Sequence, residues 1–189
     1  MSSDRFSFSP IGEFAGLRLV QRMAIEDERG YLSRFFCAEE FAKAGVNMPV
    51  AQINHTLTRK KGAVRGMHFQ HTPHAEKKLV SCIKGEVWDV AVDLRRNSPT
   101  FLRWHGELLS ASNRKSLLIP EGFAHGFQTL TEDCELIYLH TEAYHSASED
   151  AVNALDTALS INWPIEIVEL SDRDRKHKFI EQNFQGIIL

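Results

Sequence analysis

The stretch KLVSCIKGEVWDVAVDLR, residues 78–95, decides the fold class because it reads as two β-strands in succession. Both halves are short and rich in β-branched residues, and Lys84-Gly85 between them is a turn signal. Apolar runs of similar length recur along the chain at 17–23, 51–58, 63–69, 78–85, 86–95, 100–110, 115–120, 123–130 and 134–141. We therefore predict an all-β fold in which two antiparallel sheets enclose a cavity, as in a double-sheet sandwich or barrel.

Helical patterns lie only outside this β region. The segment 37–46 precedes most of it, and a second segment follows Leu170, where Ser171 and Asp174 have the spacing of a capping box. We predict short helices that flank the sheets. A length of 189 residues is typical of a single domain, so we expect residues 1–189 to form one.

The overall composition argues against several classes of protein. A net charge of −3 gives no broad positive field for nucleic acid or for an anionic membrane. The N-terminal sequence MSSDRFSFSP lacks the apolar stretch of a secretion signal, and no apolar run is long enough to span a membrane. Cys37, Cys82 and Cys134 form no CxxC pair, which favours isolated buried thiols. We expect a cytoplasmic protein with no nucleic-acid or membrane partner.

Strand alternation assigns the polar side chains to faces. Asp89 and Asp93 share one face of their strand, which is either exposed to water or lines a polar cavity where a histidine can bind them. In 63–69, alternation puts His68 on one face and Arg65 on the other. His68 alone is compatible with a structural buried histidine as well as with a base.

A metal site is one possible interpretation of the histidines. The pattern P-x-G-x-x-H at 120–125 matches half of the metal-binding signature of cupin barrels. The other half is incomplete, because Gln70 stands where a second histidine would follow His68 on the same strand face. A set formed by His68, Glu76 and His125 remains an alternative.

Other kinds of catalysis lack their motifs. The chain has no G-x-S-x-G nucleophile and no glycine-rich phosphate loop. Acid–base chemistry remains, with histidines and carboxylates on several strands and with Lys78 and Tyr138 on neighbouring ones.

Several blocks together are similar to one enzyme family. DERGYLSRFF (27–36), VRGMHFQ (64–70), GEVWDVAVDLR (85–95), IPEGFAHGF (119–127), ELIYLHT (135–141) and LSDRD (170–174) resemble, in that order, the dTDP-4-dehydrorhamnose 3,5-epimerases and relatives that act on other nucleotide-linked 4-keto-6-deoxy sugars. The resemblance runs from about Gly16 to Asp174. It implies a cupin-like jelly-roll barrel without metal or other cofactor, a nucleotide-diphosphate sugar as substrate, and a homodimer that exchanges an N-terminal strand.

The resemblance also implies roles for individual residues. His68 matches the base that removes a proton next to the 4-keto group, and Asp174 matches the carboxylate that orients it, although Asp174 is also placed to cap a helix. Lys78 matches the cation near the ketone oxygen. Tyr138 matches the acid that returns a proton to the opposite face, the alternative being an aromatic that only packs across strands.

Further residues match the substrate-binding positions of the family. Arg65 and Arg29 match phosphate-binding arginines, while Gln52 and Asn54 match polar positions near the nucleotide and sugar. The remaining matches are His125 and Asp89, near the base, and Arg175, which neighbours Asp174 and is within reach of the diphosphate.

Some positions depart from the family pattern. Glu76-Lys77 stands where Gln-Gly is common, Leu139 replaces a lysine, and Arg34 replaces an acidic residue near the nucleotide. These differences leave open which carbons are inverted and which nucleotide base is bound. A nucleotide-sugar ketoisomerase, a metal-dependent cupin enzyme and a cupin that only binds a sugar nucleotide remain alternatives. We expect His71 and His74 to be loop residues without a chemical role.

Overall fold

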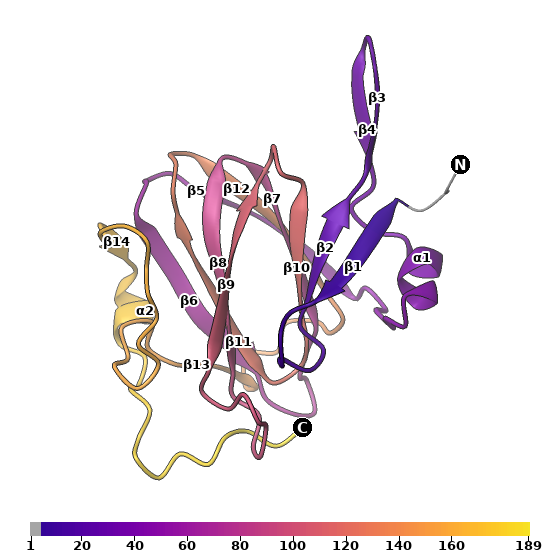
Figure 1. The fold of residues 1–189 in the computed structure, drawn as a ribbon. Helices are drawn as coiled ribbons and strands as arrows, with labels where there is room; N and C mark the ends of the chain where they lie inside the picture. Colours follow the sequence, from indigo (N-terminus) through magenta and orange to yellow (C-terminus); the bar gives the residue numbers. More distant parts are fainter. Residues whose placement is uncertain (1–4) are drawn as a thin grey trace.

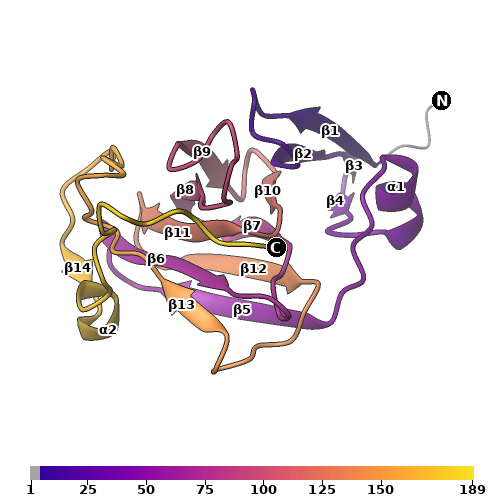
Figure 2. The ribbon, with the colours of Figure 1, turned by 90° about the horizontal axis from the view of Figure 1, so that it is seen from below.

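The computed structural model describes residues 5–189, which form two β-sheets that face each other (Figures 1 and 2). Across the first sheet the strands are, in order, β1 (Phe6–Pro10), β2 (Arg18–Arg22), β10 (Lys115–Ile119), β7 (Lys78–Lys84), β12 (Cys134–His140) and β5 (Gln52–Thr58). Across the second they are β13 (Glu149–Ala151), β6 (Ala63–Gln70), β11 (Phe123–Thr129), β8 (Glu86–Asp93) and β9 (Trp104–Ser110), with β14 (Glu169–Leu170) parallel to β6. The predicted all-β, double-sheet jelly roll is confirmed.

The remaining elements lie around these sheets. A hairpin of β3 (Ala24–Asp27) and β4 (Gly30–Ser33) projects away from both sheets (Figure 1). Helix α1 (Ala38–Lys43) lies at one end of the molecule, whereas α2 (Asp172–Arg175) and β14 lie at the other (Figure 2). Within residues 5–189, no helix is long and apolar enough to cross a membrane.

Eight of the nine predicted strands are present with bounds that differ by no more than two residues. The prediction for 100–110 is wrong at its start, because β9 begins only at Trp104. The chain turns before it: Leu102 has a φ of 60° and donates its backbone N–H to the carbonyl of Asp93 (2.8 Å). The predicted helix 37–46 is also shorter, since Gly45 leaves the helical region with a φ of 74°.

Apolar side chains fill three layers, which explains why the central strands have apolar residues on both faces. The cluster between the sheets includes Val80, Cys82, Val87, Ala91, Leu117 and Leu136. On the outer face of the second sheet, Val90 and Val92 pack against the C-terminal segment that contains Leu159 and Leu170. On the outer face of the first sheet, Leu79 packs with Phe41 of α1.

The opening stretch of sequence crosses from one sheet to the other at Gly85. Strand β7 belongs to the first sheet and β8 to the second, with only this glycine between them. Gly85 has a φ of 76°, and a Cβ there would lie 2.5 Å from Oγ1 of Thr131 and 2.8 Å from Sγ of Cys134. Oγ1 of Thr131 accepts the backbone N–H of Glu86 (3.0 Å), so it cannot move without losing that bond. The crossing therefore requires glycine.

We predict that Gly85→Ala lowers the free energy of unfolding by about 2 kcal/mol or more, because positive-φ strain and a steric clash add. The matched control is Gly45→Ala, at a φ of 74° with nothing within 4 Å, which should cost only about 1 kcal/mol. Urea denaturation of both variants measures the difference. Equal losses would show that the crossing at Gly85 is not sterically constrained.

Candidate active site

A cavity of about 190 Å³ opens between the two sheets. Its lining is mostly polar and comes from both sheets: Gln52, Asn54, Thr56, Lys78, Tyr138 and His140 from the first, and Arg65, His68, Gln70, His125, Phe127 and Glu149 from the second. Side chains of one strand face point the same way, so the inner faces of β5, β6, β11 and β12 together form this cavity. It can therefore bring groups from distant parts of the chain to one substrate.

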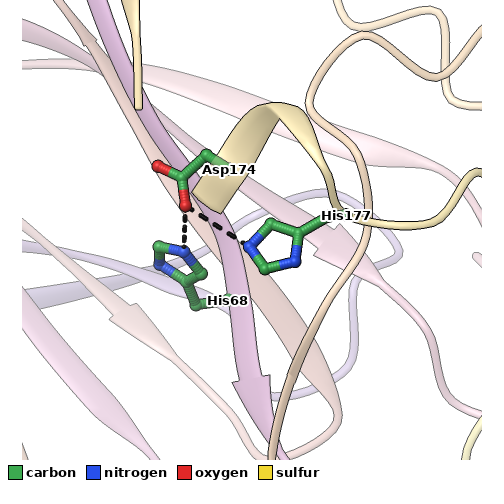
Figure 3. A group of neighbouring side chains, drawn as sticks. All are labelled: His68, Asp174 and His177. Atoms are coloured by element: carbon green, nitrogen blue, oxygen red, sulfur yellow. Dashed lines mark hydrogen bonds and ion pairs between the residues drawn. The ribbon is translucent and has the colours of Figure 1, made fainter. Parts of the chain in front are cut away.

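His68 is hydrogen-bonded to Asp174, as the resemblance implies (Figure 3). Its Nε2 lies 2.8 Å from Oδ1 of the buried carboxylate. Burial alone would raise the pKa of Asp174, but the hydrogen bond and the charge of His68 outweigh it, so the pKa is lowered. With Nε2 donating to Asp174, Nδ1 is the only ring nitrogen of His68 that is left to accept a proton.

Asp174 takes part in the cap of α2 only through its backbone, whereas its side chain pairs with His68. Its backbone N–H donates to Oγ of Ser171 (3.0 Å), the cap of α2, while its side chain pairs with His68. The cap fixes the start of the helix, and the helix carries the carboxylate to His68.

Lys78 is the first residue of β7, where it is buried and has a charged partner. Its Nζ lies 3.1 Å from Oε1 of Glu76 and donates to the carbonyl of His68 (3.3 Å). Oε2 of Glu76 accepts a hydrogen bond from Nδ1 of His140 (2.7 Å). Burial raises the pKa of Glu76, but the hydrogen bond from His140 and the charge of Lys78 more than offset this, so its pKa is lowered. An ionised glutamate therefore lies beside the lysine inside the cavity.

Tyr138 lies on the inner face of β12 opposite the histidines of the second sheet. Its ring is 5.9 Å from that of His125 and 6.1 Å from that of His140. Burial raises the pKa of its hydroxyl, so the group is protonated at neutral pH. Tyr138 also packs with the core between the sheets. It therefore both packs against neighbouring strands and lines the cavity.

His125 pairs with Asp89 as a second histidine–carboxylate pair. Nε2 of His125 lies 2.8 Å from Oδ1 of Asp89, which is completely buried, and burial raises the pKa of this carboxyl. Asp89 thus binds a histidine, as one interpretation of this strand face expected, but it lies behind His125 and does not line the cavity itself. Asp93 is buried too, but it binds Arg95, Ser98 and Thr100 and so holds the turn before β9.

The prediction that Arg65 and His68 point to opposite faces is wrong. In the pairing of β6 with β11, His68 is opposite His125 and Arg65 is opposite Phe127, so β6 contains one extra residue between them. This bulge reverses the alternation. As a result, Arg65 enters the same cavity as His68, where Gln52 and Asn54 also lie.

Two predicted phosphate-binding arginines lie outside this cavity. Arg29 is at the tip of the β3–β4 hairpin, is 90% exposed, and pairs with Asp27 at 2.6 Å. Arg175 donates to the carbonyl of Leu170 (3.3 Å) and does not line the cavity. Neither guanidinium is brought to the site within this chain.

The alternative metal set of His68, Glu76 and His125 lines the cavity, but each of the three side chains is bound to another partner. Glu76 binds His140 and Lys78, and His125 binds Asp89. His68 instead lies with Asp174 and with a histidine that the sequence did not single out, His177. His177 has no motif around it that points to a site, whereas His140 could have been found, because it is two residues beyond Tyr138 and so shares its strand face.

Comparison with known proteins identifies the family to which this chain is similar. The family model for dTDP-4-dehydrorhamnose 3,5-epimerase matches residues 12–182. A relative of that name from Shigella flexneri is 42% identical over 91% of this chain and 96% of its own. The fold matches a dTDP-4-dehydrorhamnose 3,5-epimerase from Bacillus anthracis, solved with TDP and pyrophosphate bound, with a TM-score of 0.89 and 34% identity over 93% of this chain and 99% of the other.

A second solved structure adds a bound sugar nucleotide. It is a dTDP-6-deoxy-D-glucose-3,5-epimerase from Legionella pneumophila in complex with dTDP-4-keto-L-rhamnose, with a TM-score of 0.85 and 38% identity over 92% of each chain. The family match at residues 12–182 includes every strand of the two sheets except β1, as well as the segment that carries Asp174.

We predict that Glu76→Gln lowers the free energy of unfolding at pH 7 by about 2 kcal/mol or more, because it leaves the buried Lys78 without its counter-charge. The pKa of Glu76 is lowered in the fold, so its stabilisation is complete above its ordinary value of 4.5 and is lost as the pH falls through the folded value. Urea denaturation at pH 7 and at pH 4 or below should therefore show a difference that shrinks in acid. A difference that does not depend on pH would contradict an ionised Glu76.

Proposed function

The chain belongs to the dTDP-4-dehydrorhamnose 3,5-epimerase family and is an epimerase, and from this premise we propose how its cavity carries out the reaction. The substrate class is a dTDP-linked 4-keto-6-deoxyhexose, inverted at carbon 3, carbon 5 or both, in deoxysugar biosynthesis of the dTDP-L-rhamnose type. The reaction removes a proton next to the 4-keto group and returns one to the opposite face. We propose that the residues of this chain supply the base, the acid and the stabilisation of the intermediate without a cofactor.

His68 is the proposed base. A carbon acid next to a ketone is weaker than imidazolium by roughly a dozen pK units, which is about 16 kcal/mol. Asp174 holds the ring by its Nε2 proton, so Nδ1 is available for the proton of the sugar, and the carboxylate stabilises the imidazolium that forms. A positioned base of this kind contributes about two to four orders of magnitude to the rate.

Lys78 is the proposed stabiliser of the enolate. Its ammonium group is buried in the cavity and is held by Glu76 and by the carbonyl of His68. A fixed cation at the place where negative charge develops is often the largest contribution to catalysis. The ionised Glu76 offsets part of the charge of Lys78, and His140 in turn binds Glu76, so these two residues set how much positive charge the oxygen meets.

Tyr138 is the proposed acid, and its position relative to His68 is the observation that carries the proposal. Inversion needs a base on one face of the sugar and an acid on the other. His68 comes from the second sheet and Tyr138 from the first, and both line the cavity that separates the sheets. A base alone would exchange the proton, whereas a donor across the cavity allows inversion.

Arg65, Gln52 and Asn54 are the proposed contacts to the nucleotide diphosphate and sugar. They line the same cavity as the proposed base and acid. An arginine fork suits a phosphate because it donates two hydrogen bonds with a full charge. His125 and Asp89 support the wall beside the base. Arg175 remains unassigned, because its guanidinium binds the carbonyl of Leu170.

We also propose that the enzyme is a homodimer that exchanges an N-terminal strand. The β3–β4 hairpin projects from its own sheets and exposes Tyr31 and Leu32, which are 60% and 68% exposed. The outer edge of the first sheet is β5, where Ile53 is 63% exposed. Apolar surface and an unpaired edge of this kind are typical of interfaces. In such a dimer Arg29 would reach the phosphates in the cavity of a partner subunit.

We predict that the wild-type enzyme incorporates deuterium at carbon 3, carbon 5 or both when dTDP-4-keto-6-deoxyglucose is incubated in heavy water. Because His68 starts the reaction, His68→Ala should reduce exchange by at least about 100-fold. Tyr138→Phe should keep exchange but lose inversion at one carbon or more. Mass spectrometry and NMR of the product measure both.

The same experiment separates the alternatives. Exchange at a single carbon would identify a mono-epimerase, and a shifted carbonyl would identify a ketoisomerase. Absence of exchange at either carbon in the wild-type enzyme would contradict the proposed activity on this substrate. Near-wild-type inversion in both variants would refute the proposed roles of His68 and Tyr138.

We predict that Arg29→Ala raises the KM for the dTDP-sugar about tenfold or more, because it removes a charged hydrogen bond to phosphate across the dimer. The matched control is Arg103→Ala, which removes another exposed arginine, paired with Glu13 at 3.0 Å. Light scattering gives the oligomeric state. A monomer in solution would contradict the dimer, and a dimer with unchanged KM in Arg29→Ala would contradict the role of Arg29.

A further inference from the structure

Two histidines, His68 and His177, approach the same carboxylate oxygen of Asp174 (Figure 3). Nε2 of His68 is 2.8 Å from Oδ1, and Nε2 of His177 is 3.3 Å from the same atom. The three ligand atoms all lie within 4.8 Å of one another. His177 follows α2, so the short helix that delivers Asp174 also delivers the second histidine.

His177 has no hydrogen bond that accounts for this position. Its Nε2 is buried and makes no hydrogen bond within the described part of the chain, although it lies at ion-pair distance from Oδ1 of Asp174. A buried ring nitrogen that points at a carboxylate without a hydrogen bond is costly, unless a proton or another cation lies between the two groups. A shared proton or a bound cation between the two groups would compensate this nitrogen.

We propose that His68, Asp174 and His177 bind a divalent transition-metal ion of the Zn²⁺ class, and that this ion switches off the proposed base. Two imidazoles and one carboxylate are a common ligand set for such ions, with water in the fourth position. Ligand atoms that lie about 2.0–2.1 Å from a tetrahedral ion are roughly 3.3 Å apart, close to the separations of 2.8 and 3.3 Å from Asp174 to the two rings.

The ion would lie behind the base and outside the cavity. His68 lines the cavity, whereas Asp174 and His177 do not. Next to the cluster, Arg173 and Glu149 form an ion pair, and their charges offset each other. A metal ion at this position would leave room for the substrate and would act on the reaction only through His68.

The inhibition follows from the two nitrogens of one imidazole ring. A neutral imidazole carries a single proton, and a nitrogen that binds a metal uses its lone pair to do so. If Nε2 of His68 binds the ion, the proton must be on Nδ1. Nδ1 is the atom that has to accept the proton of the sugar, so the metal-bound histidine cannot act as the base. The inference rests on the proposed role of His68, but the metal site itself does not.

Metal binding can be measured without any substrate. We expect the full-length protein, purified without a histidine tag and stripped with a chelator, to bind one Zn²⁺ per chain in calorimetry. Co²⁺ at the same site should give visible d–d absorption. His177→Gln should weaken Zn²⁺ binding at least about tenfold and abolish the Co²⁺ spectrum. His177→Phe, which keeps a ring against His68, provides a second test if the glutamine variant folds poorly.

The matched control is His55→Gln, which removes a histidine paired with one carboxylate at 2.9 Å and should leave Zn²⁺ binding unchanged. In kinetics, Zn²⁺ should lower kcat of the wild-type enzyme with little change in KM, and a chelator should restore it. Both His177 variants should turn over without metal as the wild type does and should resist Zn²⁺.

Each outcome bears on one part of the proposal. Absence of Zn²⁺ binding, or equal binding by wild type and both His177 variants, would overturn the site. Binding to the wild type at this site without loss of kcat would overturn the switch. If instead the protein binds Zn²⁺ but exchanges no deuterium into the sugar even when metal-free, the epimerase proposal fails while the metal site stands.

Discussion

The close approach of β6 to β11 is the constraint on which the cavity depends. A Cβ at Gly66 would lie 2.5 Å from Cα of Gly126, and a Cβ at Gly126 would lie 2.7 Å from the carbonyl oxygen of Arg65. Only two glycines allow the backbones to pass at this distance, and the bulge in β6 forms there. Because of the bulge, a guanidinium and an imidazole from one strand enter the same space. A regular ladder would have sent them to opposite sides of the sheet.

Three histidines around the cavity each have a carboxylate partner. The pairs are His68 with Asp174, His125 with Asp89, and His140 with Glu76, and their partners come from a C-terminal helix, a neighbouring strand and a loop. Each pair fixes the orientation of a ring through a hydrogen bond to a buried carboxylate. The cost of ordering these groups is therefore met when the chain folds rather than when a substrate binds.

The fold could be predicted from the sequence because strand alternation and turn residues are local signals. The roles of Lys78, Tyr138 and Asp174 came from the resemblance to a family. Their spacing in the sequence alone does not show that these residues lie close together. The relation of Arg65 to His68 was not predictable from alternation, since the bulge arises from contact with another strand. His177 and Glu149 lie in segments without periodic pattern, and only tertiary packing brings His177 to Asp174 and Glu149 to the cavity. Arg29 and Arg175 match family positions in the sequence, yet neither lines the cavity of this chain. A motif match alone does not fix where a side chain lies.

The partner of His68 is carried by α2, which lies more than one hundred residues further along the chain. Protein synthesis proceeds from the N-terminus, and domains begin to fold as they emerge. Strands β1 to β12 therefore leave the ribosome before Asp174 does. The His68–Asp174 pair can therefore form only after nearly the whole chain has been made.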